Sequence, residues 1–399
     1  MNSDQLGRAT LALCLGSLIV FANLYTTQPL LPLFVSEFAL TELEAARSLT
    51  VTTLMLGLSL LFYGAWSDAI GRKIIMVISL CGISLTTLAL SYVETFEQLL
   101  WLRGLHGFLL GGIPATAIAY IGEEFPRTKV AAAIGFYISA NSLGGILGRT
   151  LSGIVSDIWN WQMVFSLMTL ANIAVAIFFI ATLPASTAFR SQKLNPRSII
   201  NGLTTHLCNR NLLLAYLIGG CNFMIVLTLY SYVIFLLADE PFSLSTSWLG
   251  LLFLTYLSGS IGSAYIGKID KKISCAERIV MGTALIIVGT LVTLYGSLSA
   301  IIIGLLINGF GFFVAHSSLS TWVNQYAIGS KASASSLYLV FYYFGASIGN
   351  IYLDPFWRWG QYQGVVAAAT LTLFFSLLAT LWLRKQEASQ NTGGEISTG

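Results

Sequence analysis

Charged residues are scarce in this chain of 399 residues. Asp, Glu, Lys and Arg make up 9% of it, against 56% hydrophobic residues, and the mean hydropathy is +0.78. Because soluble domains carry about 25% charged residues, this composition excludes an ordinary soluble protein. A helix needs about 20 apolar residues to cross the ~30 Å core of a bilayer. The sequence therefore predicts an all-α membrane protein with twelve spans, at approximately 9–34, 48–66, 74–93, 98–121, 130–155, 162–183, 211–237, 246–267, 277–297, 299–327, 332–353 and 361–383.

Catalytic and metal-binding patterns are also missing. The five cysteines lie outside the predicted outer loops and show neither a disulfide framework nor metal-ligand spacing. No Ser-His-Asp set and no phosphate-binding loop faces either compartment. The net charge of +3 forms no basic patch of the kind that binds nucleic acid. We therefore expect no enzymatic activity, no metal, no cofactor and no nucleic-acid partner.

Basic residues are nearly absent from one set of connections. With the N-terminus placed inside, sixteen Lys and Arg residues fall in cytoplasmic segments, and only Arg47 and Arg358 fall in outer loops. Lys and Arg stay on the cytoplasmic side of membrane proteins. The sequence thus predicts a multi-pass protein of a bacterial-type inner membrane with both termini in the cytoplasm.

The two halves of the chain resemble each other. An offset of 202 residues places Asp68 on Asp270 and Gly107 on Gly309. An offset of 201 places the glycines of 144–148 on those of 345–349. Parallel six-span halves of this kind occur in transporters, where the substrate site lies between them near the middle of the membrane.

The repeat predicts the domain organisation. Two pseudo-symmetric six-helix bundles are joined by a polar, basic cytoplasmic linker, and a tail rich in Ser, Thr, Gly and Glu is expected to be disordered. The boundaries are 1–183 for the first bundle, 184–210 for the linker, 211–385 for the second bundle and 386–399 for the tail.

One stretch between the second and third spans carries a recognisable spacing. Residues 64–73 read G-x-x-x-D-x-x-G-R-K, which resembles the signature loop of the major facilitator superfamily. The resemblance implies a transporter that works by alternating access, with this loop latching the cytoplasmic ends of the two halves. We expect Gly64 to let two helices pack closely, Asp68 to meet a helix N-terminus and Gly71 to permit a tight reversal. The latch residues implied are Gly64, Asp68, Gly71, Arg72 and Lys73, with Asp270 from the second copy.

A second motif lies in the fourth span. Residues 99–107 resemble the L-x-x-x-R-x-x-Q-G motif of proton-coupled drug antiporters, with His106 at the Gln position. The resemblance implies a proton-coupling role for Arg103. His106 shares a helix face with Arg103 and titrates near neutral pH, so it could carry the proton itself. The alternative for Arg103 is that its side chain snorkels to the outer interface.

A third motif lies in the fifth span. Residues 144–153 resemble G-x-x-x-G-P-x-x-G-G, an antiporter motif associated with exporters, but Arg149 replaces the proline and Ser152 a glycine. The kink that the proline supplies is therefore in doubt. A buried cation here either binds a substrate carboxylate or phosphate or pairs with Asp157, and the sequence leaves both readings open.

Acidic residues are missing from the depth of every predicted span, since Asp68, Asp157 and Asp239 fall at ends. This absence weakens the case for proton antiport and disfavours multivalent organic cations as substrates. A neutral, zwitterionic or anionic substrate is expected, bound by amides, aromatic residues and Arg149. The predicted substrate-binding residues are Asn23, Tyr25, Gln28, Asn141, Arg149, Asn222, Tyr230, Asn308 and Tyr342.

The function predicted is secondary active transport of a small molecule across the inner membrane, by proton-coupled efflux of a drug or metabolite. The proton gradient is the expected energy source, membrane lipid is the expected surrounding partner, and the chain is expected to be a monomer. One alternative is proton-coupled or uncoupled uptake of a small organic solute, possibly anionic. An alternative of another class is a non-transporting membrane sensor, which should carry a sizeable soluble domain that this chain lacks.

Overall fold

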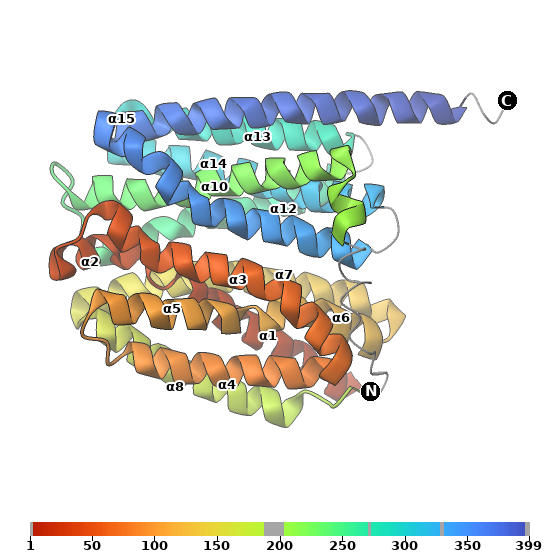
Figure 1. Ribbon diagram of the computed structural model, residues 1–399, viewed down its shortest axis with the longest axis horizontal. Coiled ribbons are helices and arrows are strands. Elements are labelled where there is room, and N and C mark those ends of the chain that lie inside the picture. Colours follow the sequence, from red (N-terminus) through yellow and green to blue (C-terminus); the bar gives the residue numbers. More distant parts are fainter. Residues whose placement is uncertain (1–2, 187–202, 270–272, 328–330, 396–399) are drawn as a thin grey trace. The chain divides into compact units, whose positions relative to one another are not determined.

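The predicted fold class is confirmed by a computed structural model, which describes residues 3–186, 203–269, 273–327 and 331–395 (Figure 1). Helices dominate these residues, and none of them forms a strand. Ten helical segments within the described ranges are long and apolar enough to cross a membrane. The last of them, Ser333–Glu387, contains a reversal at Gly360–Gln361 and therefore accounts for two predicted spans. The eighth predicted span, 246–267, is not among these ten segments, because the 3₁₀ turn η2 (Leu252–Tyr256) interrupts it.

The described residues group into two compact units. The first comprises Met1–Pro196 together with Ile234–Leu254, and the second comprises Arg197–Val233 together with Thr255–Gly399. The boundaries drawn from the sequence stay a prediction, because the predicted linker lies mostly outside the described residues. The helix that ends the described chain continues to Glu395, into the stretch predicted as a disordered tail.

The first unit holds the helices of the first half of the chain. The buried apolar side chains of these helices form its core, and buried Ser, Thr and Asn side chains lie among them. Its elements are α1 (Ser3–Tyr25), η1 (Gln28–Leu30), α2 (Leu31–Phe38), α3 (Glu42–Ile70), α4 (Arg72–Leu90), α5 (Phe96–Leu110), α6 (Gly112–Glu124), α7 (Arg127–Ile158), α8 (Trp161–Thr182), α11 (Thr246–Leu251) and the end of α10 (Arg210–Ala238).

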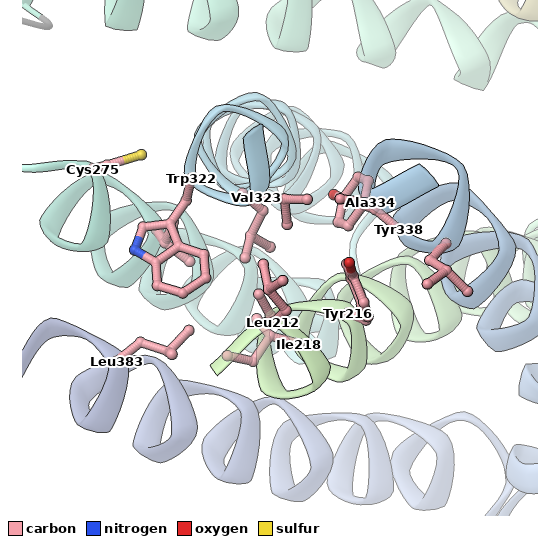
Figure 2. Packing of buried hydrophobic residues seen from close by; sticks show 13 residues of the cluster. Leu212, Tyr216, Ile218, Cys275, Trp322, Val323, Ala334, Tyr338 and Leu383 are labelled. Atoms are coloured by element: carbon pink, nitrogen blue, oxygen red, sulfur yellow. The ribbon is translucent and has the colours of Figure 1, made fainter. Parts of the chain in front are cut away.

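The second unit is built in the same way. Figure 2 shows part of its core, in which Tyr216 of α10, Trp322 and Tyr338 are enclosed by aliphatic side chains. Its elements are most of α10, the end of η2 (Leu252–Tyr256), α12 (Leu257–Ile269), α13 (Cys275–Val292), η3 (Thr293–Tyr295), α14 (Leu298–Tyr326) and α15 (Lys331–Glu395).

Capping residues fix where several helices begin. Thr41 and Glu44 form a reciprocal capping box at the start of α3, and Thr95 does the same with Gln98 at the start of α5. Such boxes satisfy backbone N–H groups that the first helical turn leaves without partners. Their positions explain why α3 and α5 begin outside the apolar runs that the sequence marked.

Close glycine contacts repeat in the two units. A methyl group on Gly144 or Gly148 of α7 would meet the backbone of Leu18 or Ala22 of α1. These bare surfaces let the two backbones touch.

In the second unit, Gly345 and Gly349 of α15 stand at an offset of 201 and would meet the backbone of Gly220 and Met224 of α10. The partners in α10 follow those in α1 at an offset of 202. The duplication read from the sequence is thus repeated in the packing within each unit.

The first span is broken rather than continuous. α1 ends at Tyr25, and a 3₁₀ turn over Gln28–Leu30 with Pro29 near its start leads into α2. Pro29 and Pro32 lack the N–H groups that an unbroken helix would need. The break leaves backbone carbonyls at the buried end of α1, and their partners form part of the site described next.

Candidate functional site

The signature stretch is a one-residue turn instead of a loop. α3 continues through Ile70 and α4 begins at Arg72, with only Gly71 between them at φ 111° and ψ 142°. This conformation suits glycine because an L side chain rarely adopts it. Asp68 lies in the last turn of α3 and pairs with Arg72, the first residue of α4, and its contact with a helix N-terminus stays a prediction. A methyl group on Gly64 would meet no described atom within 4 Å, so close packing does not explain that residue.

Arg72 holds the end of α3 to α6. Its guanidinium lies 2.5 Å from the Asp68 carboxylate and 2.9 Å from that of Glu123, and it donates to Ser67 Oγ. Glu123 was missed by sequence reasoning because it follows the predicted fourth span, 98–121. Asp270, the predicted partner from the second half, lies outside the described residues.

Lys73 turns away from the acids that bind Arg72. Its ammonium donates to the carbonyls of Ile180 and Leu183 at the end of α8. These carbonyls form the negative end of that helix, where a cation is stabilised. Two adjacent cations thus secure two different neighbours of α4.

Arg103 is fully buried and is held by backbone carbonyls. Its terminal nitrogens donate to the carbonyls of Asn23 at 3.0 Å and Leu24 at 2.8 Å, and its Nε approaches the Ser48 carbonyl at 3.5 Å. The guanidinium therefore caps the C-terminal end of α1 by hydrogen-bonding two of its last carbonyls. The alternative that Arg103 snorkels to the interface is wrong, because none of the residue's surface is exposed.

His106 lies one turn further along α5 and is also fully buried. Its Nδ1 lies 3.1 Å from Thr86 Oγ1, and its Nε2 has no hydrogen-bond partner in the described part of the chain. Whether it carries a proton stays a prediction.

Asn23 belongs to a buried network between α1, α4 and α8. Its amide donates to Asn172 Oδ1 at 2.8 Å, Asn172 donates to Thr87 Oγ1 at 3.0 Å, and Thr87 donates to Asn23 Oδ1 at 3.1 Å. These three side chains satisfy one another. They bind three helices of one unit together, a role that the substrate prediction for Asn23 did not anticipate.

Asn222 occupies the matching place in the second unit. Its amide donates to Thr283 Oγ1 of α13 at 3.2 Å, and Ser376 of α15 donates to its Oδ1 at 2.8 Å. Each half therefore ties its first helix to its third and sixth through one buried amide.

Arg149 lies in α7, with 4% of its surface exposed. Its Nε donates to Gln28 Oε1 at 2.8 Å and its Nη1 to the Gly145 carbonyl at 2.8 Å. The guanidinium carbon lies 3.7 Å from the centre of the Tyr25 ring and 4.7 Å from that of Phe253. Three of the predicted substrate residues, Tyr25, Gln28 and Arg149, are thus brought together, and the rings stabilise the cation.

The end of α7 packs tightly against α11. Thr150 donates to the Gly250 carbonyl at 3.2 Å, and a methyl group on Gly153 would crowd Gly250. Asp157 accepts a hydrogen bond from Ser245 at 2.9 Å, an arrangement that the sequence did not predict.

The remaining predicted substrate residues contact side chains of their own units. Asn141 accepts a hydrogen bond from Ser17, and the Asn308 amide lies 3.0 Å from Thr290 Oγ1. Tyr230 hydrogen-bonds Thr255, and Tyr342 stacks on Phe223 with ring centres 3.7 Å apart. Their binding of a substrate stays a prediction.

One buried acid was missed by sequence reasoning. Asp354 lies in α15 with 6% of its surface exposed, and it is the single buried Asp or Glu among the residues whose burial the structure describes. Arg358, one turn further on, places its Nε 2.7 Å from the carboxylate. The signal was available, because Asp354 directly follows the predicted span 332–353, whereas the helix continues to Gly360.

Proteins of similar sequence include bacterial membrane transporters. The chain is 36% identical over 376 residues to an uncharacterized MFS-type transporter, YybF, of Bacillus subtilis, covering 94% of this chain and 92% of that protein. It is 36% identical over 385 residues to the inner membrane transport protein YnfM of Escherichia coli, covering 96% and 92%. The multidrug resistance protein MdtG of Proteus mirabilis is 28% identical over 195 residues, 48% of this chain and 46% of that protein.

Solved structures and a family model agree on the architecture. A crystal structure of the nucleoside transporter NupG matches with a TM-score of 0.77 at 14% sequence identity, covering 94% of this chain and 99% of that chain. The model of the Major Facilitator Superfamily matches residues 13–350. The chain is therefore a multi-pass membrane transporter that belongs to the Major Facilitator Superfamily.

Proposed function

We propose that this transporter exports a neutral, zwitterionic or anionic small organic molecule in exchange for protons. The direction is supported by the similarity of about half the chain to a multidrug resistance protein. The motif around Arg149 supports it as well, because it resembles one associated with exporters. The preference against multivalent cations follows from the buried charges, which are Arg103, Arg149, Arg278 and Asp354 among the described residues.

The observation that carries proton coupling is Asp354. An ionisable side chain within a membrane-spanning helix is costly and marks a functional site by default. Its carboxylate is buried, whereas its partner Arg358 has 64% of its side-chain surface exposed. The ion pair therefore lies at the boundary between the buried interior of the unit and its surface.

The chemistry of this pair suits a coupling step. Protonation of Asp354 neutralises the carboxylate and removes the attraction for Arg358, whereas release of the proton restores the ion pair. Uncharged groups pack against this segment: Tyr232 of α10 donates to the Asn350 carbonyl one turn before Asp354, and its ring lies 5.1 Å from that of Trp357. One proton on Asp354 thus changes the net charge of the Asp354–Arg358 pair from zero to +1, just before the reversal at Gly360.

Transport in inverted membrane vesicles tests the proposal. The vesicles carry the wild-type chain and are energised to acidify their interior, and uptake of radiolabelled chloramphenicol and norfloxacin is measured as a neutral and a zwitterionic probe. Accumulation that nigericin abolishes by collapsing the pH gradient is expected for at least one probe. Accumulation that survives nigericin would contradict proton coupling, and accumulation only in right-side-out vesicles would contradict export.

Replacing the carboxylate separates coupling from substrate movement. Asp354→Asn keeps the side chain's shape but cannot take up a proton, so we expect concentrative uptake to fall at least tenfold while exchange of labelled for unlabelled probe continues. Glu94→Gln, an exposed acid before α5, is the matched control and should transport like the wild type. Equal concentrative uptake by Asp354→Asn and wild type would remove Asp354 from the coupling step.

A further inference from the structure

A hollow of about 450 Å³ lies against the first unit where α3 ends, α4 begins and α8 ends. Its wall is apolar and consists of isoleucine and valine side chains at the end of α3, on α4 and on α8. Several of these side chains are about half exposed although they belong to helices that cross the membrane. The apolar wall comprises Ile70, Ile74, Val77, Ile78 and Ile180.

The size of the hollow favours a chain-like occupant. An engineered apolar cavity of ~150 Å³ is enough to take up benzene, and this one is about three times as large. Ile74, Val77 and Ile78 follow one another at helical spacing along α4, so the hollow runs with the helix axis into the membrane. An acyl chain of the bilayer fits both the chemistry and the direction.

The mouth of the hollow is positively charged. Lys73 lines it, and no carboxylate lies within ion-pair distance of its ammonium in the described part of the chain. The nearby acids Asp68 and Glu123 are bound by Arg72 instead. Lys73 therefore lies at the entrance without a carboxylate partner among the described residues, held in place by the carbonyls of Ile180 and Leu183.

A second polar group lines the same mouth. Ser186 belongs to the lining, and its hydroxyl oxygen is enclosed without a hydrogen-bond partner in the described ranges. A buried hydroxyl left unpaired costs free energy, which an incoming acceptor would recover. A cation and a hydroxyl donor above an apolar groove complement an anionic head group attached to an acyl chain.

We propose that this hollow is a binding site for an anionic phospholipid of the surrounding membrane. The phosphate accepts hydrogen bonds from Lys73 and Ser186, and one acyl chain lies along α4 between Ile74, Ile78 and Ile180. The site lies between the turn at Gly71 and the end of α8. A bound lipid therefore holds these two segments together, as Lys73 already does through its hydrogen bonds to Ile180 and Leu183. This assignment does not depend on the direction of transport or on proton coupling.

Native mass spectrometry of the purified full-length chain tests the site. Dioleoyl-phosphatidylglycerol and dioleoyl-phosphatidylcholine share their acyl chains, so a comparison isolates the head group. Since one Lys beside an anionic head group contributes ~1 kcal/mol, we expect the wild type to bind one phosphatidylglycerol about fivefold more tightly than phosphatidylcholine. Lys73→Gln should reduce this ratio to about one, and Lys73→Arg should restore it.

Two further variants separate the site from general charge and from folding. Lys385→Gln removes an exposed cation of α15 and should leave the ratio unchanged. Val77→Trp fills the groove while keeping Lys73, and it should weaken binding of both lipids. Each variant is first checked for a wild-type thermal midpoint without added lipid, and Val77→Trp decides the test if Lys73→Gln unfolds. A ratio of one in the wild type, a full ratio in Lys73→Gln, or unchanged binding in Val77→Trp would overturn the proposal.

Discussion

At the scale of single residues, buried polar side chains make hydrogen bonds between helices that the apolar pattern of the sequence does not predict. Arg103 shows this best, because its side chain closes the broken end of α1 by donating to the carbonyls of Asn23 and Leu24. Each carbonyl left unpaired in a buried place costs about 1–3 kcal/mol. The arginine has a structural task in addition to any part in coupling.

Replacing this side chain should therefore destabilise the protein. Arg103→Ala is expected to lower the thermal midpoint by several degrees, and Arg103→Lys by less, because an ammonium reaches one carbonyl where the guanidinium fork reaches two. Arg47→Ala, which removes an exposed cation of α3, is the control and should leave the midpoint unchanged. An Arg103→Ala variant as stable as the wild type would remove Arg103 from this structural task.

The sequence was informative about such residues when a motif fixed their spacing. Asp68, Gly71, Arg72 and Arg103 were all marked in advance. The partners of Arg103 were not, because a hydrogen bond to a backbone carbonyl of another helix leaves no trace in residue identity. The second partner of Arg72, Glu123, was missed because it lies beyond the predicted span. Asp354 was overlooked for a different reason. The apolar run ended one residue before it, while the helix did not end there.

At the scale of helices, all twelve predicted apolar runs fall on helical segments, although the run at 246–267 is interrupted, and the ends of several were not predicted. Helix ends follow capping boxes and single turns, such as Thr41 with Glu44 at the start of α3, rather than hydropathy. The interruption of the first span could be foreseen from its prolines. The break of 246–269 by η2 could not, because no proline or unusual residue marks it.

Helix contacts give a prediction with an internal control. Gly148→Ala in α7 would place a methyl group against the backbone of Ala22, so α1 and α7 must separate and the thermal midpoint should fall. Gly135→Ala in the same helix meets no atom within 4 Å and should be neutral or slightly stabilising, by up to about 1 kcal/mol, since alanine favours helix over glycine. Equal midpoints for the two variants, measured by thermal unfolding in detergent, would refute the close contact.

At the scale of the whole molecule, the duplicated plan is the part that the sequence revealed most completely. The duplication reappears in the glycine contacts, whose members stand 201 or 202 residues apart, and in the amide networks of Asn23 and Asn222, which join corresponding helices without keeping a fixed offset. The halves differ in their buried charges. The first holds Arg103 and Arg149, and the second holds Asp354 and Arg278 among the described residues. This asymmetry could not be predicted from the repeat, since it arises where the two copies diverged.

The central claim is that substrate and proton movements are coupled through the second half of this duplicated transporter. Its most direct test is proton movement driven by a substrate gradient in proteoliposomes of the purified wild type, with pyranine trapped inside and the membrane potential clamped. For whichever probe the vesicle assay identifies, an imposed gradient should drive protons in the opposite direction, and Asp354→Asn should abolish that flux while exchange of the probe persists. Substrate movement that leaves the internal pH unchanged in the wild type would contradict the account.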